Sequence, residues 1–548
     1  MVSLWGSKDQ TSGTEESTNP AHADGADAEQ SQPPRPHRSE EHTDERSRLL
    51  PPRQDRFLDP DDPAASIHTC LSEAVLTRAQ VSPYNLWTVR AIRFFAVAFF
   101  AITFLWWVLL LVSIFVSPPG MHSRGSGFFD VSYTTLTAAN LLVGILFFSI
   151  PSKALELTSM FVALLLFIDT IIIVSVAQLR FEEGWVGIAS VIWATLMAVY
   201  IVISDRVVAW GKGEEEERLT GRRETRRSLA EWLGVFTYTF IMVVIIIVTL
   251  LLTATLILRA RDASLEAPGQ KYFVDDDKYR VHLSCNGVAD DAYPTILVEA
   301  GSEPYEGTLG PFFEAAYKNG TIQRYCYWDR PGLAFSDNAP SPHSAGMSID
   351  ALSEALAQAG ELGPYVLVSA DIGSIYSRIF SSRHSGDVEG IMLVDPLHED
   401  YLWNIGNARR GFVLWGWGII SPLGLQRLAG VIFHGRTRED RVYGRSANQS
   451  GRYIKAKLQE NLVATSLTRT EVGTARNIQD KTTPLVVVSS GIKYRSNQEW
   501  AEKQEAMTKI TNNLVAWDVV KRAPHNVWET LEGRTVMEKR LGQLVKKN

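Results

Sequence analysis

The middle of the chain consists of long apolar runs separated by short polar segments. Five runs together hold a single charged residue, and each is long enough to cross a hydrocarbon core of about 30 Å as a helix. They are residues 94–116, 131–150, 157–179, 185–204 and 232–258. The last run is apolar at nearly every position of Met242–Leu252, whereas an amphipathic soluble helix keeps one polar face. The sequence therefore predicts a transmembrane domain over residues 90–260 with about five helical spans, with four or six as alternatives.

The one charged residue in these runs is Asp169, near the middle of the third. A carboxylate inside a membrane is costly and often marks an ion or substrate path. Because no second charge stands at a comparable depth, we favour a protonated or hydrogen-bonded packing role. A transporter remains a distant alternative that rests on this residue alone.

From about residue 270 the pattern changes to short β-branched runs that alternate with helical stretches. This alternation predicts a mostly parallel sheet with helices on both faces, over residues 270–548. The candidate strands are 279–284, 295–299, 324–328, 365–369, 391–395, 485–489 and 515–520. An insertion at about residues 398–484 separates the fifth strand from the sixth, and an insertion of that length predicts a functional helical lid. Its apolar stretch Gly411–Pro422 fits a contact with the bilayer and a helix lining a pocket equally well, but three glycines and a proline make it a poor sixth span.

Residues 1–85 are polar and rich in Pro, Ser and charged residues, which predicts a disordered cytosolic tail. The tail has no apolar core of a secretory signal, and its acidic excess over the first 50 residues disfavours a mitochondrial presequence. Glu45, Leu49 and Leu50 resemble an acidic dileucine signal read by sorting adaptors. Short motifs of this kind arise by chance, so an ordinary tail is the alternative.

Basic residues are concentrated in alternate loops, most densely between the fourth and fifth runs. The positive-inside rule then predicts a cytosolic N-terminus, and five spans place the C-terminal domain on the lumenal or extracellular side. Two glycosylation sequons, at Asn319 and Asn448, lie in that domain and agree with this orientation. We expect a multi-pass protein of a secretory or vacuolar membrane, with a mitochondrial membrane as the alternative.

Charge and cysteine content narrow the classes of function further. The net charge is −7 and no large basic field is present, which argues against a nucleic-acid partner. The three cysteines, Cys70, Cys285 and Cys326, lack the spacing of a zinc site, so neither a metal nor another cofactor is expected. A Cys285–Cys326 disulfide and buried reduced thiols are equally good alternatives.

Several blocks of the C-terminal domain resemble, in the correct order, the α/β-hydrolases of the esterase and lipase type. The blocks are Tyr279–Gly287 and Pro294–Gly301 at the opening strands, Trp328–Gly332 with Ser336 and Asp337 at a tight turn, Gly363–Arg378 at the strand–elbow–helix unit, Gly390–Pro396 at the next strand, and Ala523–Asn526 at the histidine loop. The resemblance implies an α/β-hydrolase fold, and the fusion to a membrane domain is similar to the layout of some fungal membrane proteins.

The elbow of this unit carries Asp371 where esterases have serine, between the small residues Ser369 and Gly373 that a sharp strand-to-helix turn needs. An aspartate at this place resembles the haloalkane dehalogenases and epoxide hydrolases. In these enzymes the carboxylate attacks a carbon atom, and a histidine-activated water hydrolyses the alkyl ester. The resemblance implies that His525 is the base and that Asp395 orients it. A buried Asp371 in an inactive hydrolase, and an Asp395 that only caps a turn, are the alternatives.

Other residues follow from the same resemblance. The backbone N–H groups of Ile372 and Ser302 are candidates for the oxyanion hole. Candidate substrate contacts in the predicted lid are Trp415, Trp417, Tyr443 and Tyr453. Ile372 departs from the tryptophan that binds halide in dehalogenases, and no lid tyrosine can be assigned the acid role of epoxide hydrolases, so neither subclass is indicated. We predict a membrane-anchored hydrolase for a small apolar substrate delivered from the bilayer. The alternative is a non-catalytic scaffold of the membrane; substrate and oligomeric state are not indicated.

Overall fold

The computed structural model describes residues 86–121, 123–150, 152–221, 229–290 and 292–546. Several features named above lie outside the described residues. They are the tail with its predicted disorder, the pattern at Glu45, Leu49 and Leu50, Cys70, and the arginine-rich segment 222–227.

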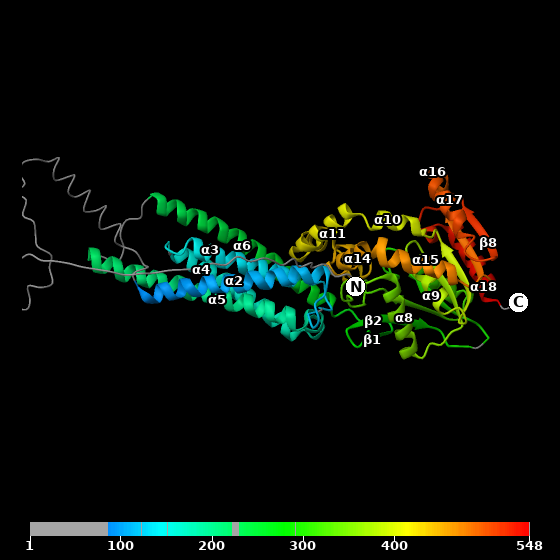
Figure 1. The fold of residues 1–548 in the computed structure, drawn as a ribbon, viewed down its shortest axis with the longest axis horizontal. Helices are drawn as coiled ribbons and strands as arrows, with labels where there is room; N and C mark the ends of the chain where they lie inside the picture. Colours follow the sequence, from blue (N-terminus) through cyan, green and yellow to red (C-terminus); the bar gives the residue numbers. More distant parts are fainter. Residues whose placement is uncertain (1–85, 122, 151, 222–228, 291, 547–548) are drawn as a thin grey trace, which may run out of the picture. The chain divides into compact units, whose positions relative to one another are not determined.

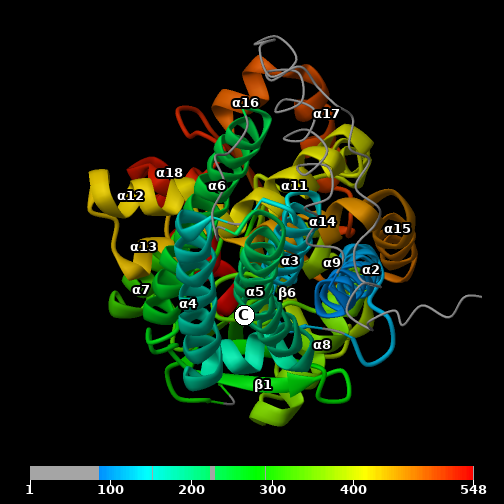
Figure 2. The ribbon, with the colours of Figure 1, turned by 90° about the vertical axis from the view of Figure 1, so that its left-hand side faces the viewer.

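The described part of the chain contains five long apolar helices, which form its membrane part. They are α2 (Trp87–Phe115), α3 (Phe128–Leu146), α4 (Lys153–Ser175), α5 (Ala177–Thr220) and α6 (Leu229–Asp262). By length and composition, each is able to cross a membrane, which confirms the predicted class of domain. Helices α3, α4, α5 and α6 share an apolar core, and Leu110 and Ile114 of α2 pack into a second core with α3 and α5. Figure 2 looks along the bundle from one end. Apolar side chains such as Phe94 and Phe236 point outward instead, as expected for surfaces that face lipid.

Asp169 lies on α4 and is fully buried. The hydroxyl of Tyr133 on α3 donates a hydrogen bond to its Oδ2 atom over 3.2 Å. The carboxyl group is therefore engaged in packing between two membrane helices.

The C-terminal domain is built on an eight-stranded sheet with the order β1-β2-β4-β3-β5-β6-β7-β8. The strands are β1 (Gln270–Val274), β2 (Tyr279–Asn286), β3 (Thr295–Glu299), β4 (Tyr325–Asp329), β5 (Tyr365–Ala370), β6 (Val388–Val394), β7 (Pro484–Ser490) and β8 (Asn513–Val520). β2 runs antiparallel to its neighbours β1 and β4, and all other pairs are parallel. This order, with one antiparallel strand near the edge, is that of the α/β-hydrolase fold, so the predicted fold class is confirmed.

Helices cover both faces of the sheet (Figure 1). The sheet positions them because alternate residues of a strand point to opposite faces. On β5, Leu367 packs toward a core that includes α8 (Ala345–Ala359) and α9 (Gly373–Arg383). Val366 and Val368 pack into a second core with α7 (Gly310–Lys318) and α18 (Leu531–Val545). Burial on both faces explains why the strand is apolar at successive positions.

The insertion between β6 and β7 is helical. Its main helices are α10 (Leu402–Ile405), α11 (Ala408–Ile420), α12 (Leu425–His434), α13 (Arg438–Val442), α14 (Gly451–Val463) and α15 (Arg469–Ile478). Helix α11 packs closely on α3, and a Cβ atom at Gly418 would clash with the ring of Phe128. Only glycine permits this approach, so the insertion is fitted to the membrane helices as well as to the sheet.

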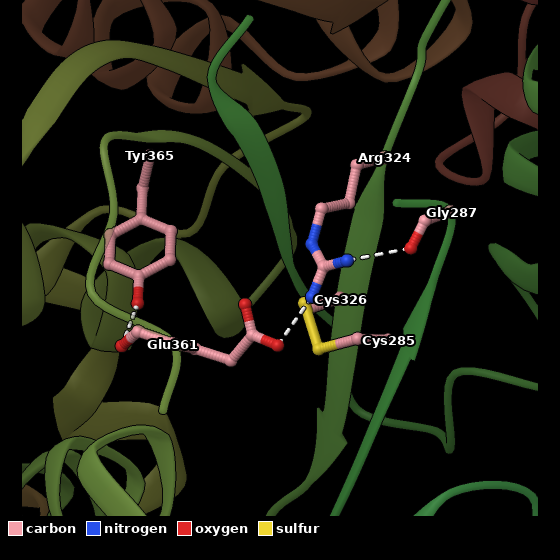
Figure 3. The surroundings of a disulfide bond; sticks show 6 residues. All are labelled: Cys285, Gly287, Arg324, Cys326, Glu361 and Tyr365. Atoms are coloured by element: carbon pink, nitrogen blue, oxygen red, sulfur yellow. Dashed lines mark hydrogen bonds and ion pairs between the residues drawn. A yellow bond between two sulfur atoms is a disulfide. The ribbon is translucent and has the colours of Figure 1, made fainter. Parts of the chain in front are cut away.

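A disulfide joins Cys285 of β2 to Cys326 of β4, where the two residues are directly paired across antiparallel strands (Figure 3). Beside it, Arg324 donates hydrogen bonds to the carbonyl oxygen of Gly287 over 2.6 Å and to the carboxylate of Glu361. The disulfide alternative of the two left open by the sequence is therefore the one present in the structure.

Candidate active site

The candidate nucleophile Asp371 stands at the turn between β5 and α9. Its φ angle is +47°, in the left-handed region that costs energy for a residue other than glycine. Gly373 makes the turn possible, because a Cβ atom there would clash with the carbonyl oxygen of Ala300. The turn therefore projects the Asp371 carboxylate beyond the end of the strand, beside the first turn of α9.

Asp371, His525 and Asp395 converge at the carboxyl ends of β5, β6 and β8. The His525 Nε2 atom lies 3.4 Å from Oδ1 of Asp371, and its Nδ1 atom lies 2.5 Å from Oδ2 of Asp395. The Asp395 side chain is fully buried, whereas His525 remains 31% exposed. The imidazole thus bridges one buried carboxylate and one at the elbow, in the order that the sequence predicts.

The charges of these groups shift one another's proton affinity. Burial alone would lower the pKa of His525, but hydrogen bonds and the charges of Asp371 and Asp395 outweigh burial and raise the pKa to about 9. Burial would raise the pKa of Asp371, yet hydrogen bonds from His525, Ser302 and the Ile372 N–H hold it well below its usual range. At neutral pH the site therefore holds an imidazolium between two carboxylates.

The loop after β3 lies directly against Asp371. The Ser302 hydroxyl donates a hydrogen bond to Oδ2 of Asp371. Arg330 fixes the loop from behind, since its guanidinium donates to the carbonyl oxygens of Ala300, over 2.7 Å, and of Gly301. The same guanidinium donates to Glu299 over 2.5 Å. Arg330 thus holds the loop that carries Ser302.

Glu299 is the carboxylate behind this loop. Burial raises its pKa to about 7, although Arg330 and the Trp328 indole N–H, which donates over 2.5 Å, act in the opposite direction. The two oxygens of Glu299 therefore each accept a hydrogen bond, as a buried carboxylate requires.

Three residues that the sequence did not indicate contact Asp395 or the Nδ1 side of His525. The Trp500 indole N–H and the Ser490 backbone N–H donate to Oδ1 of Asp395 over 3.1 Å and 3.0 Å. Lys493 lies 3.8 Å above the Trp500 ring, and its Nζ atom is 3.3 Å from Nδ1 of His525. Ser490 is the last residue of β7, and Lys493 lies on α16 (Gly491–Ser496), which follows directly. The position of β7 between β6 and β8 was the signal in the sequence that could have found these two residues.

The other predicted contacts divide between two places. Tyr453 on α14 donates its hydroxyl hydrogen to the Ser302 carbonyl oxygen over 2.9 Å, so it reaches the loop beside Asp371. Tyr443 instead packs on Phe335 at 6.0 Å between ring centroids. The structure does not bring Trp415 to Asp371, because Trp415 packs against apolar residues of the membrane helices. Trp417 on the same helix is 50% exposed.

The two sequon asparagines are both exposed. Asn319 follows α7, and its amide donates to Glu538 over 3.2 Å. Asn448 belongs to a short 3-10 turn before α14. Their glycosylation remains a prediction.

One cluster among the described residues, His282, Glu306 and Asp329, has the ligand types of a cation site. The two ring nitrogens of His282 contact Asp329 and the carbonyl oxygen of Pro268. Burial, together with the charge of Asp329, raises the pKa of Glu306 to about 9, which keeps it neutral. A histidine with both nitrogens engaged and a neutral carboxyl group make a poor ligand set.

Relatives of the chain include uncharacterized proteins of two yeasts. Over 541 residues the chain is 36% identical to an uncharacterized protein of Schizosaccharomyces pombe, in an alignment that covers 92% of this chain and 97% of that protein. It is 25% identical over 384 residues to an uncharacterized vacuolar membrane protein of Saccharomyces cerevisiae, covering 59% of each. Residues 38–285 match the family model described as a region of unknown function, DUF2417.

Solved structures that match the C-terminal domain include hydrolases of low sequence identity. An epoxide hydrolase from Acinetobacter nosocomialis is 14% identical, with a TM-score of 0.39, over 55% of this chain and 97% of that one. An esterase from Thermogutta terrifontis is also 14% identical, with a TM-score of 0.34, over 51% of this chain and all of that one. The fold assignment rests on the strand order above and not on these scores.

Together, the five apolar helices and the eight-stranded sheet define a membrane protein with an α/β-hydrolase-like domain. The chain belongs to the same family as the Schizosaccharomyces pombe protein and carries the DUF2417 region at residues 38–285.

Proposed function

We propose that this protein is a membrane-anchored hydrolase in which Asp371 is the nucleophile, His525 the base and Asp395 the residue that orients His525. The observation that carries the proposal is the pair of contacts on one imidazole, 3.4 Å to Asp371 and 2.5 Å to Asp395. A buried carboxylate behind the histidine favours a single ring orientation, which a general base needs.

In the first step, an Asp371 oxygen forms a bond to an electrophilic carbon of the substrate. The bond from that carbon to its leaving group breaks, and the leaving group departs with the electron pair. The product is an alkyl ester of Asp371, in which the carboxyl group has lost its charge. Hydrogen bonds from Ser302 and the Ile372 N–H orient the carboxylate before the attack.

Formation of the ester changes the proton affinity of His525. One of the two carboxylates that raise its pKa to about 9 is then neutral, so the pKa falls toward the ordinary range of imidazole. His525 then releases its proton to solvent. The neutral imidazole takes a proton from water, and the resulting hydroxide attacks the ester carbonyl carbon. When the tetrahedral intermediate collapses, the bond to the alkyl oxygen breaks and that oxygen takes the proton from His525, so the alcohol leaves. The proton of the new Asp371 carboxyl group returns to His525, and one oxygen of the water remains in Asp371.

The substrate we propose is apolar and enters from the bilayer. Support comes from the insertion, where α11 packs on α3 through Gly418. Its helices also carry exposed apolar side chains, with Phe412 and Ile432 each 70% exposed and Phe433 78% exposed. Exposed apolar side chains on an insertion that packs on a membrane helix are suited to contact with lipid. The vacuolar location of the Saccharomyces cerevisiae relative supports a vacuolar membrane for this protein as well.

A single-turnover experiment in heavy-oxygen water tests the nucleophile. Excess full-length protein in nanodiscs is mixed with a long-chain terminal epoxide or a long-chain alkyl bromide. The epoxide is tested first, because epoxide hydrolases use lid tyrosines as acids and the hydroxyl of Tyr453 contacts the Ser302 loop. Mass spectrometry is expected to find one heavy oxygen in the Asp371 peptide, and none in the peptide of Asp395, which serves as the internal control.

Two variants make the result decisive. His525→Gln is expected to retain the alkyl group on Asp371, because the ester forms but no base activates water. Asp371→Ala is expected to show neither label nor alkyl group. If the wild-type protein turns over a probe without labelling Asp371, the nucleophile is assigned wrongly. If no probe reacts and both variants leave the cellular phenotype intact, the non-catalytic scaffold replaces the enzyme.

A further inference from the structure

A cavity of about 110 Å³ lies where the ends of α5 and α6 meet β1 and the insertion. Five basic side chains from five different elements line it, and they are Arg259 of α6, Lys271 of β1, Arg427 of α12, Arg441 of α13 and Arg452 of α14. None of these residues belongs to the candidate active site described above.

The acidic residues nearby do not balance these charges. Asp262 forms ion pairs with Arg427 and Arg441, each at 2.6 Å. Glu182 forms ion pairs with Arg259 at 3.0 Å and with Arg452 at 3.2 Å. Each of these two carboxylates is therefore already shared between two guanidinium groups.

A third negative charge comes from Glu183, which pairs with Arg259 at 2.6 Å. Asp130 is buried beside Glu183, and two carboxyl groups this close do not both ionise, so this pair contributes a single charge. Among the described residues at the cavity, five cations thus face three negative charges. Asp337, whose charge also reaches Lys271, is already paired with Arg280, so positive charge remains in excess. Buried charge without a partner is costly, so such a site favours an anion.

Unused donors at the cavity point to the same conclusion. The Arg427 side chain is only 8% exposed, and its Nε atom is buried without a hydrogen-bond partner among the described residues. The Nε atom of Arg452 is likewise buried and unpartnered within the described part of the chain. Lys271 forms no ion pair with a described residue, although it lines the cavity. Burial lowers the pKa of both Arg427, to about 10, and Lys271, which is the effect expected where the charged form lacks compensation.

We propose that this cavity binds one phosphate-type oxyanion, held by Arg427, Arg452 and Lys271. Guanidinium groups match the geometry of phosphate oxygens, and several N–H donors from different elements can converge on one tetrahedral anion. The volume is several times the roughly 10–15 Å³ that a single water needs, which accommodates one such group.

The position of the cavity leaves two sources for this anion. Asp262 is the last residue of the apolar helix α6, so the cavity lies at the end of a membrane-spanning segment, where lipid headgroups are found. Inorganic phosphate from the aqueous phase carries the same chemistry. The proposal does not depend on Asp371 acting as a nucleophile.

The test measures thermal unfolding of the full-length protein by tryptophan fluorescence in phosphatidylcholine nanodiscs. Sodium phosphate is compared with sodium chloride at equal ionic strength, because an anion that binds only the folded state raises Tm in a saturable way. In a second arm, phosphate-free buffer is used and the nanodiscs contain phosphatidic acid. A rise in Tm in the first arm identifies free phosphate as the source, and a rise only in the second identifies a lipid headgroup.

Variants separate a built site from the general stabilisation that phosphate gives to proteins. Lys271→Gln removes no ion pair, and in Arg427→Gln the partner Asp262 keeps Arg441, so both are expected to fold. Both should lose the saturable rise, whereas Arg409→Gln, an exposed control on α11, should keep it. If neither arm raises Tm of the wild-type protein, or if both cavity variants respond as the wild type does, the proposal is overturned.

Discussion

Replacing Asp371 by asparagine should change the proton affinity of His525, and the structure sets the size of the change. The pKa of His525 is raised from 6.5 to about 9, with Asp371 and Asp395 both contributing. The whole shift is equivalent to about 3.5 kcal/mol of differential interaction, at about 1.4 kcal/mol for each pH unit. In Asp371→Asn the side chain keeps its shape but loses its charge. We expect the pKa of His525 to fall by at least one pH unit, or about 1.4 kcal/mol.

The pKa of His525 can be measured without a substrate. Diethyl pyrocarbonate reacts with neutral imidazole only, so the rate at which the His525 peptide is modified follows the deprotonated fraction. Peptide mass spectrometry of protein in nanodiscs would give this rate between about pH 5 and pH 10, a range that spans the ordinary and the raised pKa of imidazole. The wild-type rate should reach half of its maximum near pH 9, and the Asp371→Asn rate should do so at a lower pH. Exposed His434 is the internal reference for the reagent.

Stability should depend on pH in the corresponding way. Because the folded-state pKa of His525 lies above the unfolded value of 6.5, its contribution to stability is complete below about pH 6.5 and is lost as the pH rises through about 9. The difference in unfolding free energy between the wild-type protein and His525→Gln should shrink over that interval. An unchanged modification profile in Asp371→Asn would mean that the two side chains do not face each other, and the reasoning above would be wrong.

Three further perturbations follow from the packing. Gly418→Ala should destabilise the protein by about 1–3 kcal/mol, because the new Cβ atom clashes with α3. Gly416→Ala on the same helix should stabilise it by about 0.5–1 kcal/mol, because a Cβ atom there meets nothing within 4 Å. Urea unfolding of both variants checks this contrast. Gly373→Ala should cost about 1–3 kcal/mol and abolish labelling of the elbow carboxylate in the single-turnover experiment, because the new Cβ would displace the turn. The double substitution of Cys285 and Cys326 by serine should lower the free energy of unfolding by about 4 kcal/mol, which is the loop-closure entropy expected for a loop of 41 residues. A reducing agent should shift the urea midpoint of the wild-type protein but not that of the variant.

The sheet was predictable because of how its strands are buried. β3 is buried along its whole length, so it reads as an uninterrupted apolar run, as parallel strands between helix layers do. β1 was missed because Gln270–Val274 lies at the edge and only its last residue is buried. A short strand with exposed residues has no periodicity that distinguishes it from a loop.

The candidate site was predictable only where topology fixes position. Asp371, Asp395 and His525 each follow a strand, and the carboxyl ends of parallel strands share one edge of the sheet. Trp500 also donates to Asp395, but it comes from α17 (Gln498–Met507), and no local pattern reports which face of a helix meets a loop 105 residues away. Trp415 illustrates the same limit. The apolar stretch around it fits a helix that lines a pocket and a helix that packs on the membrane domain equally well, and in the structure Trp415 packs on the membrane helices.

The ion pairs between the insertion and the membrane helices bear on what the five helices do. A single transmembrane helix already gives effectively irreversible anchoring, so anchoring alone does not require a bundle. Arg427 and Arg441 of the insertion pair with Asp262 of α6, and Arg452 pairs with Glu182 of α5. The next residue, Tyr453, contacts the loop beside Asp371. Neighbouring residues of α14 therefore contact both the bundle and the loop beside Asp371. The bundle thus takes part in positioning the candidate site, which anchoring alone does not require.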